Sequence, residues 1–341
     1  MKIIHSKRYL ISAVVGILLV LVLPFYFFFC SVTTAEDTHY IYIDADDTQD
    51  SVIAKIRPIG NATAMAGLQT LLRHAGYEEN IKTGRYAIKP GEGAITIFRR
   101  LKSGQQESLH LTIPEARTTE RLAAILCKRL MIDSATIASA LRSQEICSKL
   151  GYDTFNITAM FVPNTYDIYW NVSIDGLLDR MQKEHDRFWN TERQAKAANL
   201  QMTPNEVATL ASIIDEETAN NSEKPMIAGM YINRLKEGMP LQADPTIKFA
   251  LKDFALKRIY NKLLKIDSPY NTYIHQGLPP GPIKIASIKG IDAVLNHIEH
   301  DYLYMCAKED FSGTHNFAKN YSEHLKNATK YSKALNERGI K

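Results

Sequence analysis

An apolar run that begins at Leu210 ends in three consecutive acidic residues, within the sequence LASIIDEET. A carboxyl group that stays in water keeps a pKa near 4, whereas a carboxyl group held in a dry place has a raised pKa. A raised pKa lets a carboxyl group act as a general acid at neutral pH. The chemistry available here therefore depends on which of Asp215, Glu216 and Glu217 faces the protein interior.

The helix that carries these acids has a clear start. Thr203 and Glu206 have the spacing of a capping box, and Pro204 occupies the first helical position. From there the apolar residues recur with helical spacing, so the three acids should lie in the last turn of one helix. Their directions can then be read from the turn angle.

Helical geometry separates the three acids. At about 100° per residue, the apolar residues from Val207 to Ile214 form one broad stripe. Glu217 falls within this stripe, Asp215 falls at its edge, and Glu216 faces away. We expect Glu217 to be partly desolvated, and Asp215 and Glu216 to be solvated charges at the helix end. Two alternatives for Glu217 stay open: a helix that frays before it, or a basic partner from elsewhere.

A second carboxylate would be needed by an ordinary glycosidase, which uses two. Asp244, in LQADPT, is the candidate, and the proline after it favours an extended backbone at Asp244. The alternative is that Asp244 caps the helix predicted for TIKFAL.

Three long segments resemble a known family. They read LASIIDEETANNSEKPMIAGMYINRLKEGMPLQADPTIKFA, SPYNTYIHQGLPPGPI and YLYMCAKEDFSGTHNFA. They resemble the MltG (YceG-like) endolytic murein transglycosylases. The resemblance covers nearly the whole chain, in the family's order of anchor, small LysM-like module, TIPE segment, VPNTY segment and catalytic region.

The resemblance implies a catalytic residue. The family's motif is S-I-[IV]-E-x-E-T, and its second glutamate, the catalytic acid, matches Glu217; the first position is Asp215 here. The implied reaction cleaves the β-1,4 bond between N-acetylmuramic acid and N-acetylglucosamine within glycan strands. Glu217, as single general acid and base, would leave a 1,6-anhydro end. The implied role is to terminate or trim nascent strands, and Asp244 would then bind or support.

Substrate-binding residues are assigned by residue type and by the resemblance. Hydrogen bonds to acetamido and hydroxyl groups are expected from seven residues: Gln242, Asp244, Asn271, Thr272, Tyr273, His315 and Asn316. The turn from Leu278 to Pro282 is expected to stiffen one wall of the groove. The alternative for each residue is local support of loop backbone.

The N-terminus indicates a membrane anchor. Residues 1–9 are basic, and Leu10 to Cys30 carries no charge, which is long enough to cross about 30 Å of hydrocarbon as a helix. A cleaved signal peptide would have a shorter apolar region and a better cleavage site than SVTTAED. Basic residues before the span place residues 1–9 in the cytoplasm and the rest on the extracytoplasmic, periplasmic side of the cytoplasmic membrane.

The remaining chain predicts a mixed α+β fold in two parts. Residues 31–38 are expected to be a linker, 39–105 a LysM-like α+β module, and 106–341 a larger α+β catalytic domain. A strand is predicted at 39–45, and helical spacing occurs at 46–56, 61–77, 133–141 and 174–197. In the module, Tyr86 and Phe98 are expected to be core residues, as are Tyr302 and Tyr304 later in the chain.

Composition excludes some other functions. A formal charge of +4 over 341 residues does not support nucleic-acid binding. The four cysteines show neither CxxC pairs nor zinc spacing, so we expect small core residues rather than a disulfide framework, with one bridge left open. The implied mechanism needs no metal and no cofactor.

Two other functions compete with the transglycosylase. The chain could be a glycan-binding or scaffold protein with an inert catalytic region, or a hydrolytic muramidase. The resemblance implies glycan strands of peptidoglycan as the substrate, and the penicillin-binding proteins of wall synthesis as partners.

Overall fold

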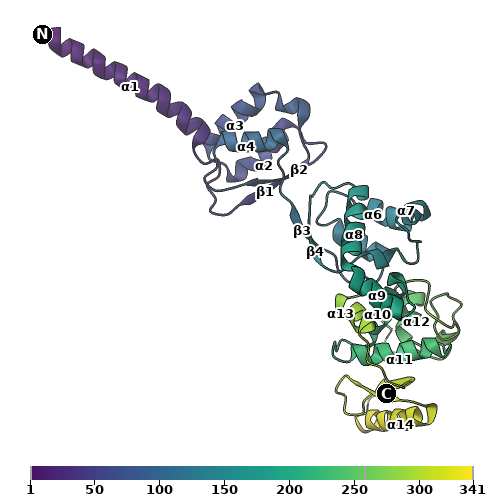
Figure 1. Cartoon of the computed structure of the whole chain (residues 1–341). Helices are drawn as coiled ribbons and strands as arrows, with labels where there is room; N and C mark the ends of the chain where they lie inside the picture. The colour runs from purple at the N-terminus through teal and green to yellow at the C-terminus, as the bar shows by residue number, and fades with distance from the viewer. Residues whose placement is uncertain (1, 257–258, 340–341) are drawn as a thin grey trace. The chain divides into compact units, whose positions relative to one another are not determined.

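The computed structural model describes residues 2–256 and 259–339 (Figure 1). The chain divides into two compact units, which comprise Met1–His110 with Asp167–Val172, and Leu111–Tyr166 with Ser173–Lys341. The division lies five residues after the predicted boundary at 105, and the first unit also takes 167–172 from the predicted catalytic domain. Residues 257–258 and 340–341 of that predicted domain lie outside the described residues.

The first unit is a small α+β structure. Its main elements are α1 (Lys2–Phe29), β1 (His39–Ile43), α2 (Gln49–Ile56), α3 (Ala62–His74), β2 (Gly84–Ile88) and α4 (Ala94–Ser103). β1 and β2 pair antiparallel, with His39 opposite Ile88 and Ile43 opposite Gly84. The predicted strand and helices are therefore confirmed.

Local sequence explains these elements. Ile41 and Ile43 are buried, while Tyr40 and Tyr42 on the other face of β1 are exposed, as alternation requires. Asn61 caps α3 by accepting hydrogen bonds from two backbone N–H groups. Gly104 ends α4 with a φ of +73°.

Some predicted assignments in this unit change. Residues 31–38 were expected to be a linker, but Val32 is fully buried in the unit's core and its N–H donates to the carbonyl of Glu92 at 2.8 Å. Tyr86 is fully buried, as expected, and Phe98 packs against the core while half-buried.

The N-terminal segment forms one helix, α1, over Lys2–Phe29, where a membrane span was expected at 10–30. Within the described residues, we find no helix that combines the length and the apolar character needed to cross a membrane. The side chains of residues 1–11, 19, 21 and 23, which include the predicted cytoplasmic segment 1–9, lie outside the described part of the chain.

The second unit contains most of the helices. Its elements are α5 (Thr119–Leu126), α6 (Ser134–Arg142), α7 (Gln144–Lys149), α8 (Ile174–Phe188), α9 (Thr191–Asn199), α10 (Pro204–Glu217), α11 (Lys224–Lys236), α12 (Asp244–Leu251), α13 (Ile288–Leu295), β5 (Tyr304–Ala307), β6 (His315–Ala318) and α14 (Tyr321–Glu337). β5 and β6 pair antiparallel. The division between the units falls within β3 (Leu109–Thr112) and β4 (Thr165–Ile168), which form a two-stranded sheet.

One predicted helix is in fact two. The spacing at 174–197 indicated a single helix, but α8 ends at Phe188 and α9 begins at Thr191. Trp189 leaves the helical conformation and is buried, with 2% of its surface exposed, and the Asn190 side chain caps α9. Burial of the large indole, a tertiary effect, therefore accompanies the break. Tyr302 and Tyr304, expected in the core, are only half-buried.

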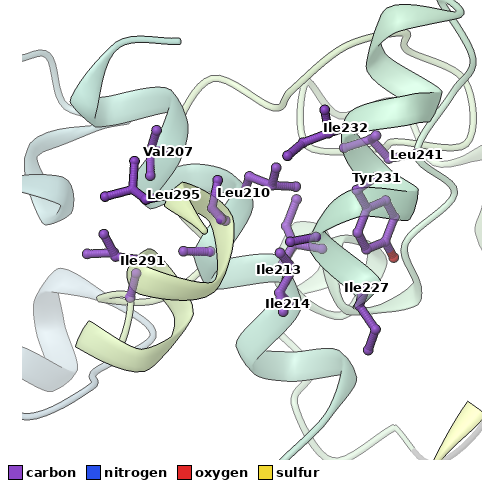
Figure 2. Packing of buried hydrophobic residues seen from close by; sticks show 14 of the residues in the cluster. Val207, Leu210, Ile213, Ile214, Ile227, Tyr231, Ile232, Leu241, Ile291 and Leu295 are labelled. Carbon is purple, nitrogen blue, oxygen red and sulfur yellow. The ribbon is translucent and has the colours of Figure 1, made fainter. Parts of the chain in front are cut away.

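Helix α10 lies at the centre of the second unit's core. It packs against α9, α11, α12 and α13. Figure 2 shows its residues Leu210 and Ile213 among side chains from α11 and α13. The capping box of Thr203 and Glu206 and the proline after it begin this helix as predicted. Residues 266–287, which follow a short helical turn, contain no helix or strand.

Candidate active site

A cavity of about 240 Å³ lies at the C-terminal end of α10, within the second unit. It is lined by residues from α10, α11, the loop before α12, the first residue of α12, the irregular segment before α13 and the β5–β6 hairpin. These are Glu217, Met230, Tyr231, Arg234, Leu241, Gln242, Asp244, Tyr273, Met305, Cys306, Ala307 and His315. Segments up to 98 positions apart in the chain thus meet at one carboxyl group.

Glu217 is the last residue of α10, so the helix does not fray before it. The side chain is half-buried in the cavity, and the hydroxyl of Tyr231 donates a hydrogen bond to its Oε1 at 2.8 Å. Among the described residues, no lysine or arginine forms an ion pair with Glu217. Both alternatives that the sequence left open for this residue are therefore excluded.

The pKa of Glu217 is raised from 4.5 to about 6. Burial is the largest cause, because it disfavours the charged form, and the negative charge of Asp244 adds to it. The hydrogen bond from Tyr231 and the charges of His315 and Lys248 act in the opposite direction. Glu217 can therefore hold a proton close to neutral pH and release it again.

Tyr231 and Arg234 in α11 were not identified from the sequence. Burial raises the pKa of Tyr231 well above its ordinary value, so the phenol stays protonated and donates to Glu217. Figure 2 shows the Tyr231 ring at one edge of the apolar cluster. Arg234 is 7% exposed and donates to the carbonyls of Leu303 and Leu241 at 2.6 and 2.8 Å. Arg234 thus ties the hairpin and the loop to α11.

Three predicted substrate-binding residues form one wall of the cavity. The Tyr273 hydroxyl donates to Oδ1 of Asp244 at 2.6 Å. Gln242 is exposed and has a φ of +51°, a left-handed conformation that is uncommon for a residue other than glycine. Its backbone N–H donates to the carbonyl of Thr272 at 3.0 Å, which holds the loop in this shape.

The backbone at Asp244 differs from the prediction. Asp244 is the first residue of α12, whereas the extended residue and N-cap is Ala243, with φ −91° and ψ 112°. The side chain of Asp244 makes no capping hydrogen bond, so the capping alternative is also wrong. Pro245 sits in the first turn, where a missing N–H is tolerated.

Asn271 and Thr272 lie beneath this wall rather than in it. Asn271 is fully buried, and its Nδ2 donates to the carbonyls of Leu264 and Ile266 at 3.0 and 2.8 Å. Thr272 is 2% exposed, and its Oγ1 accepts from the N–H of Ala243 at 3.0 Å. Both side chains support loop backbone, which is the alternative left open by the sequence.

The β5–β6 hairpin supplies further residues of the lining. His315 lines the cavity, and its backbone N–H and Nδ1 lie 2.6 and 3.0 Å from the two carboxylate oxygens of Glu223. Asn316, the next residue on β6, is outside the cavity lining, and its Nδ2 donates to Glu309 at 2.8 Å. Of the predicted binding residues, the structure therefore brings Gln242, Asp244, Tyr273 and His315 to Glu217.

Asp215 and Glu216 are not the solvated charges that were expected. The side chain of Asp215 is 2% exposed, pairs with Lys224 Nζ at 2.7 Å and accepts from the N–H and hydroxyl of Ser287 at 2.7 and 2.8 Å. Glu216 pairs with Arg117 at 2.8 Å. The helical directions predicted solvent exposure for Asp215 and Glu216, because that method assumes that other elements pack on only one face of a helix. Neighbouring helices pack on several faces of α10.

The turn from Leu278 to Pro282 does not form a wall of this cavity. Leu278, Pro279 and Pro280 line a different cavity, of about 550 Å³, together with residues of α9 and α11. Gly281 passes so close to the backbone of Phe155 that a Cβ would lie 2.2 Å from its carbonyl oxygen. This contact fixes the turn against the segment before α8.

The four cysteines are free. Cys147 is buried, whereas Cys30, Cys127 and Cys306 are half-buried, so the expectation of core residues holds fully only for Cys147. Within residues 2–256 and 259–339, no group of three His, Cys, Asp or Glu side chains could hold a metal ion.

Known proteins resemble this chain along most of its length. An endolytic murein transglycosylase of Bacillus subtilis strain 168 is 29% identical over 273 residues, which cover 75% of each protein. An endolytic murein transglycosylase of Streptococcus pneumoniae strain D39 is 26% identical over 319 residues, and the match covers 82% of this chain but 57% of that protein. The chain thus spans little more than half the length of the pneumococcal relative.

The fold is also similar to a solved structure. A crystal structure of a YceG-like protein from Listeria monocytogenes has a TM-score of 0.55 and 25% sequence identity, and the match covers 86% of this chain and 99% of that one. The sequence profile of the YceG-like family matches residues 41–330, which include every residue of the cavity around Glu217. This protein belongs to the YceG-like family.

Proposed function

We propose that this protein is a membrane-anchored endolytic lytic transglycosylase of peptidoglycan, with Glu217 as its single general acid and base. The chain is an enzyme of the lyase class, as the names of its relatives support. The observation that carries the residue assignment is the cavity itself. It holds a half-buried carboxyl group with a pKa of about 6 and one neutral donor, Tyr231.

The proton moves twice in the proposed reaction. Protonated Glu217 gives its proton to the oxygen of the β-1,4 bond between N-acetylmuramic acid and N-acetylglucosamine as that bond breaks. The resulting carboxylate then takes the proton of the C6 hydroxyl of the muramic acid, whose oxygen bonds to the anomeric carbon. The products are a 1,6-anhydro end and a free N-acetylglucosamine hydroxyl, with no water consumed.

A nucleophile tethered within the substrate explains why one acid suffices. Proximity replaces the activation of a water molecule, so a second catalytic carboxylate is not required. Asp244 accepts a hydrogen bond from Tyr273 and raises the pKa of Glu217 through its charge. We assign Asp244, with Gln242, Tyr273 and His315, to binding the glycan.

The experiment is product analysis by mass spectrometry. The full-length chain in detergent is incubated with purified glycan strands, side by side with Glu217→Gln. Wild type should release anhydro ends, and Glu217→Gln should lower their release by about 10²–10⁴-fold, the usual contribution of general acid–base catalysis. Equal release from the two proteins would remove Glu217 from the mechanism.

The same experiment separates the competing functions. A hydrolytic muramidase leaves ends that are one water heavier than anhydro ends. An inert scaffold binds glycan and releases nothing on long incubation. Asp186→Asn, which removes an exposed carboxylate outside the cavity lining, is the matched control for loss of one acid.

The location and partners are further parts of the proposal. The uncharged stretch from 10 to 30, after a basic N-terminus, supports a single-pass anchor with the catalytic unit on the extracytoplasmic side. Membrane fractionation of cells that express the full chain or residues 31–341 tests this point. A LysM-like character of residues 39–105 with glycan contact there, trimming of nascent strands, and work beside penicillin-binding proteins stay predictions from the resemblance.

A further inference from the structure

Glu223 is a buried carboxylate that the proposed reaction does not use. It is 8% exposed and directly precedes α11. Its Oε1 accepts from the backbone N–H of His315 at 2.6 Å, and its Oε2 lies 3.0 Å from Nδ1 of the same residue, 92 positions later in the chain. One carboxylate thus holds both the main chain and the ring of a single cavity residue.

This arrangement determines where the imidazole carries its proton. An ionised carboxylate only accepts hydrogen bonds, so in the neutral ring Nδ1 carries the proton and Nε2 is an acceptor. Among the described residues, the ring of His315 has one hydrogen-bond partner, which is Glu223. Nε2 is therefore the nitrogen left for a ligand in the cavity.

We propose that Glu223 is a positioning residue, which fixes the ring and tautomer of His315 so that Nε2 accepts a hydrogen bond from the glycan bound beside Glu217. The proposal rests on the proposed function. The matching group on the substrate is a hydroxyl or an acetamido N–H, since both are donors and both are abundant on amino-sugar chains.

Glu223→Gln tests this assignment with almost no change of shape. The backbone N–H of His315 can only donate, so the carbonyl oxygen of the introduced side-chain amide must face it. The nitrogen of that amide then faces Nδ1, which can meet a donor only by giving up its proton. The proton moves to Nε2, and the acceptor in the cavity becomes a donor.

Two measurements follow for the full-length chain in detergent. Long-range ¹H–¹⁵N spectra of histidine-labelled protein, with His315 assigned through His315→Gln, should show the Nδ1–H tautomer in wild type and Nε2–H in Glu223→Gln. Release of anhydro ends by Glu223→Gln should fall at least about tenfold in kcat/KM, as for the loss of one substrate hydrogen bond. Asp186→Asn, beside His185 outside the cavity lining, should keep wild-type activity.

A double-mutant cycle separates positioning from a merely structural role. If Glu223 acts through His315, then Glu223→Gln has no further effect on kcat/KM in a His315→Gln background. Effects that multiply would overturn the proposal, as would an Nε2–H tautomer in wild type or unchanged activity of Glu223→Gln. These results leave the proposed function standing as long as wild type releases anhydro ends and Glu217→Gln does not.

Discussion

The last turn of α10 carries two carboxyl groups, those of Asp215 and Glu217, in very different surroundings. Asp215 is buried against α11 and α13, where a lysine and two groups of Ser287 surround it. Glu217 is half-buried beside the cavity, with one neutral donor, Tyr231, at hydrogen-bond distance. One carboxyl group is held in an ion pair, and the other, with its pKa raised to about 6, can change its charge near neutral pH.

This difference shows that burial alone does not make a catalytic acid. The ion pair of Asp215 compensates the loss of water with a buried cation, and the resulting contact joins the ends of three helices. Glu217 lacks such a cation, so its desolvation appears as a pKa of about 6. Asp215 is therefore tied to α11 and to the start of α13 in the same helical turn that presents Glu217 to the cavity.

The largest effect on stability is expected from removal of the ion pair between Lys224 and Asp215. Lys224→Met leaves a buried carboxylate without its cation, and we expect the free energy of unfolding to fall by about 3–5 kcal/mol. Urea unfolding of the full chain measures this. Lys149→Met is the matched control, because that lysine also lies 2.7 Å from a carboxylate but on an exposed pair, where little change is expected. Equal destabilisation by the two substitutions would contradict the comparison.

The next largest effect concerns how the raised pKa of Glu217 changes the free energy of unfolding with pH. The folded-state pKa of about 6 lies above the ordinary value of 4.5, so the folded protein binds this proton more tightly than the unfolded chain. That contribution is fully present below pH 4.5 and is lost as pH rises through 6. Glu217→Gln should therefore raise the free energy of unfolding by about 2 kcal/mol at pH 7.5 relative to wild type.

Urea unfolding at several pH values checks this prediction. The advantage of Glu217→Gln should shrink toward pH 4.5 and then vanish. Asp215→Asn serves as the contrast, because it deprives Lys224 of its charged partner and should destabilise the protein at pH 7.5. A Glu217→Gln variant that is less stable than wild type at pH 7.5 would show that Glu217 is not desolvated.

The smallest effect concerns the donor of Glu217. The hydrogen bond from Tyr231 favours the carboxylate form, so Tyr231→Phe should raise the pKa of Glu217. The alkaline limb of the pH–rate profile for release of anhydro ends should move to higher pH, and the rate at pH 7 should change by less than about tenfold. A limb that stays in place or moves to lower pH would exclude Tyr231 as the group that tunes Glu217.

Local signals predicted the scaffold of the site well. The capping box at Thr203 and the proline after it start α10, and the apolar stripe placed Glu217 on a side of the helix that faces the protein interior. The helix start and the direction of Glu217 depend on residues within a few positions of each other, so the folded chain keeps both features. The same reasoning failed for Asp215, because the helical directions within α10 alone cannot show that α13 packs on the side of α10 that carries Asp215.

The sequence by itself determined the helix, its start and the inward direction of Glu217, since these depend on backbone hydrogen bonding and apolar spacing along one segment. Only the tertiary structure decided which groups meet that acid. Tyr231 lies 14 positions after Glu217, and the pair of Glu223 and His315 spans 92 positions. Contacts of this kind depend on how the helices and the hairpin pack against one another, so the spacing of residues within a single segment cannot predict them.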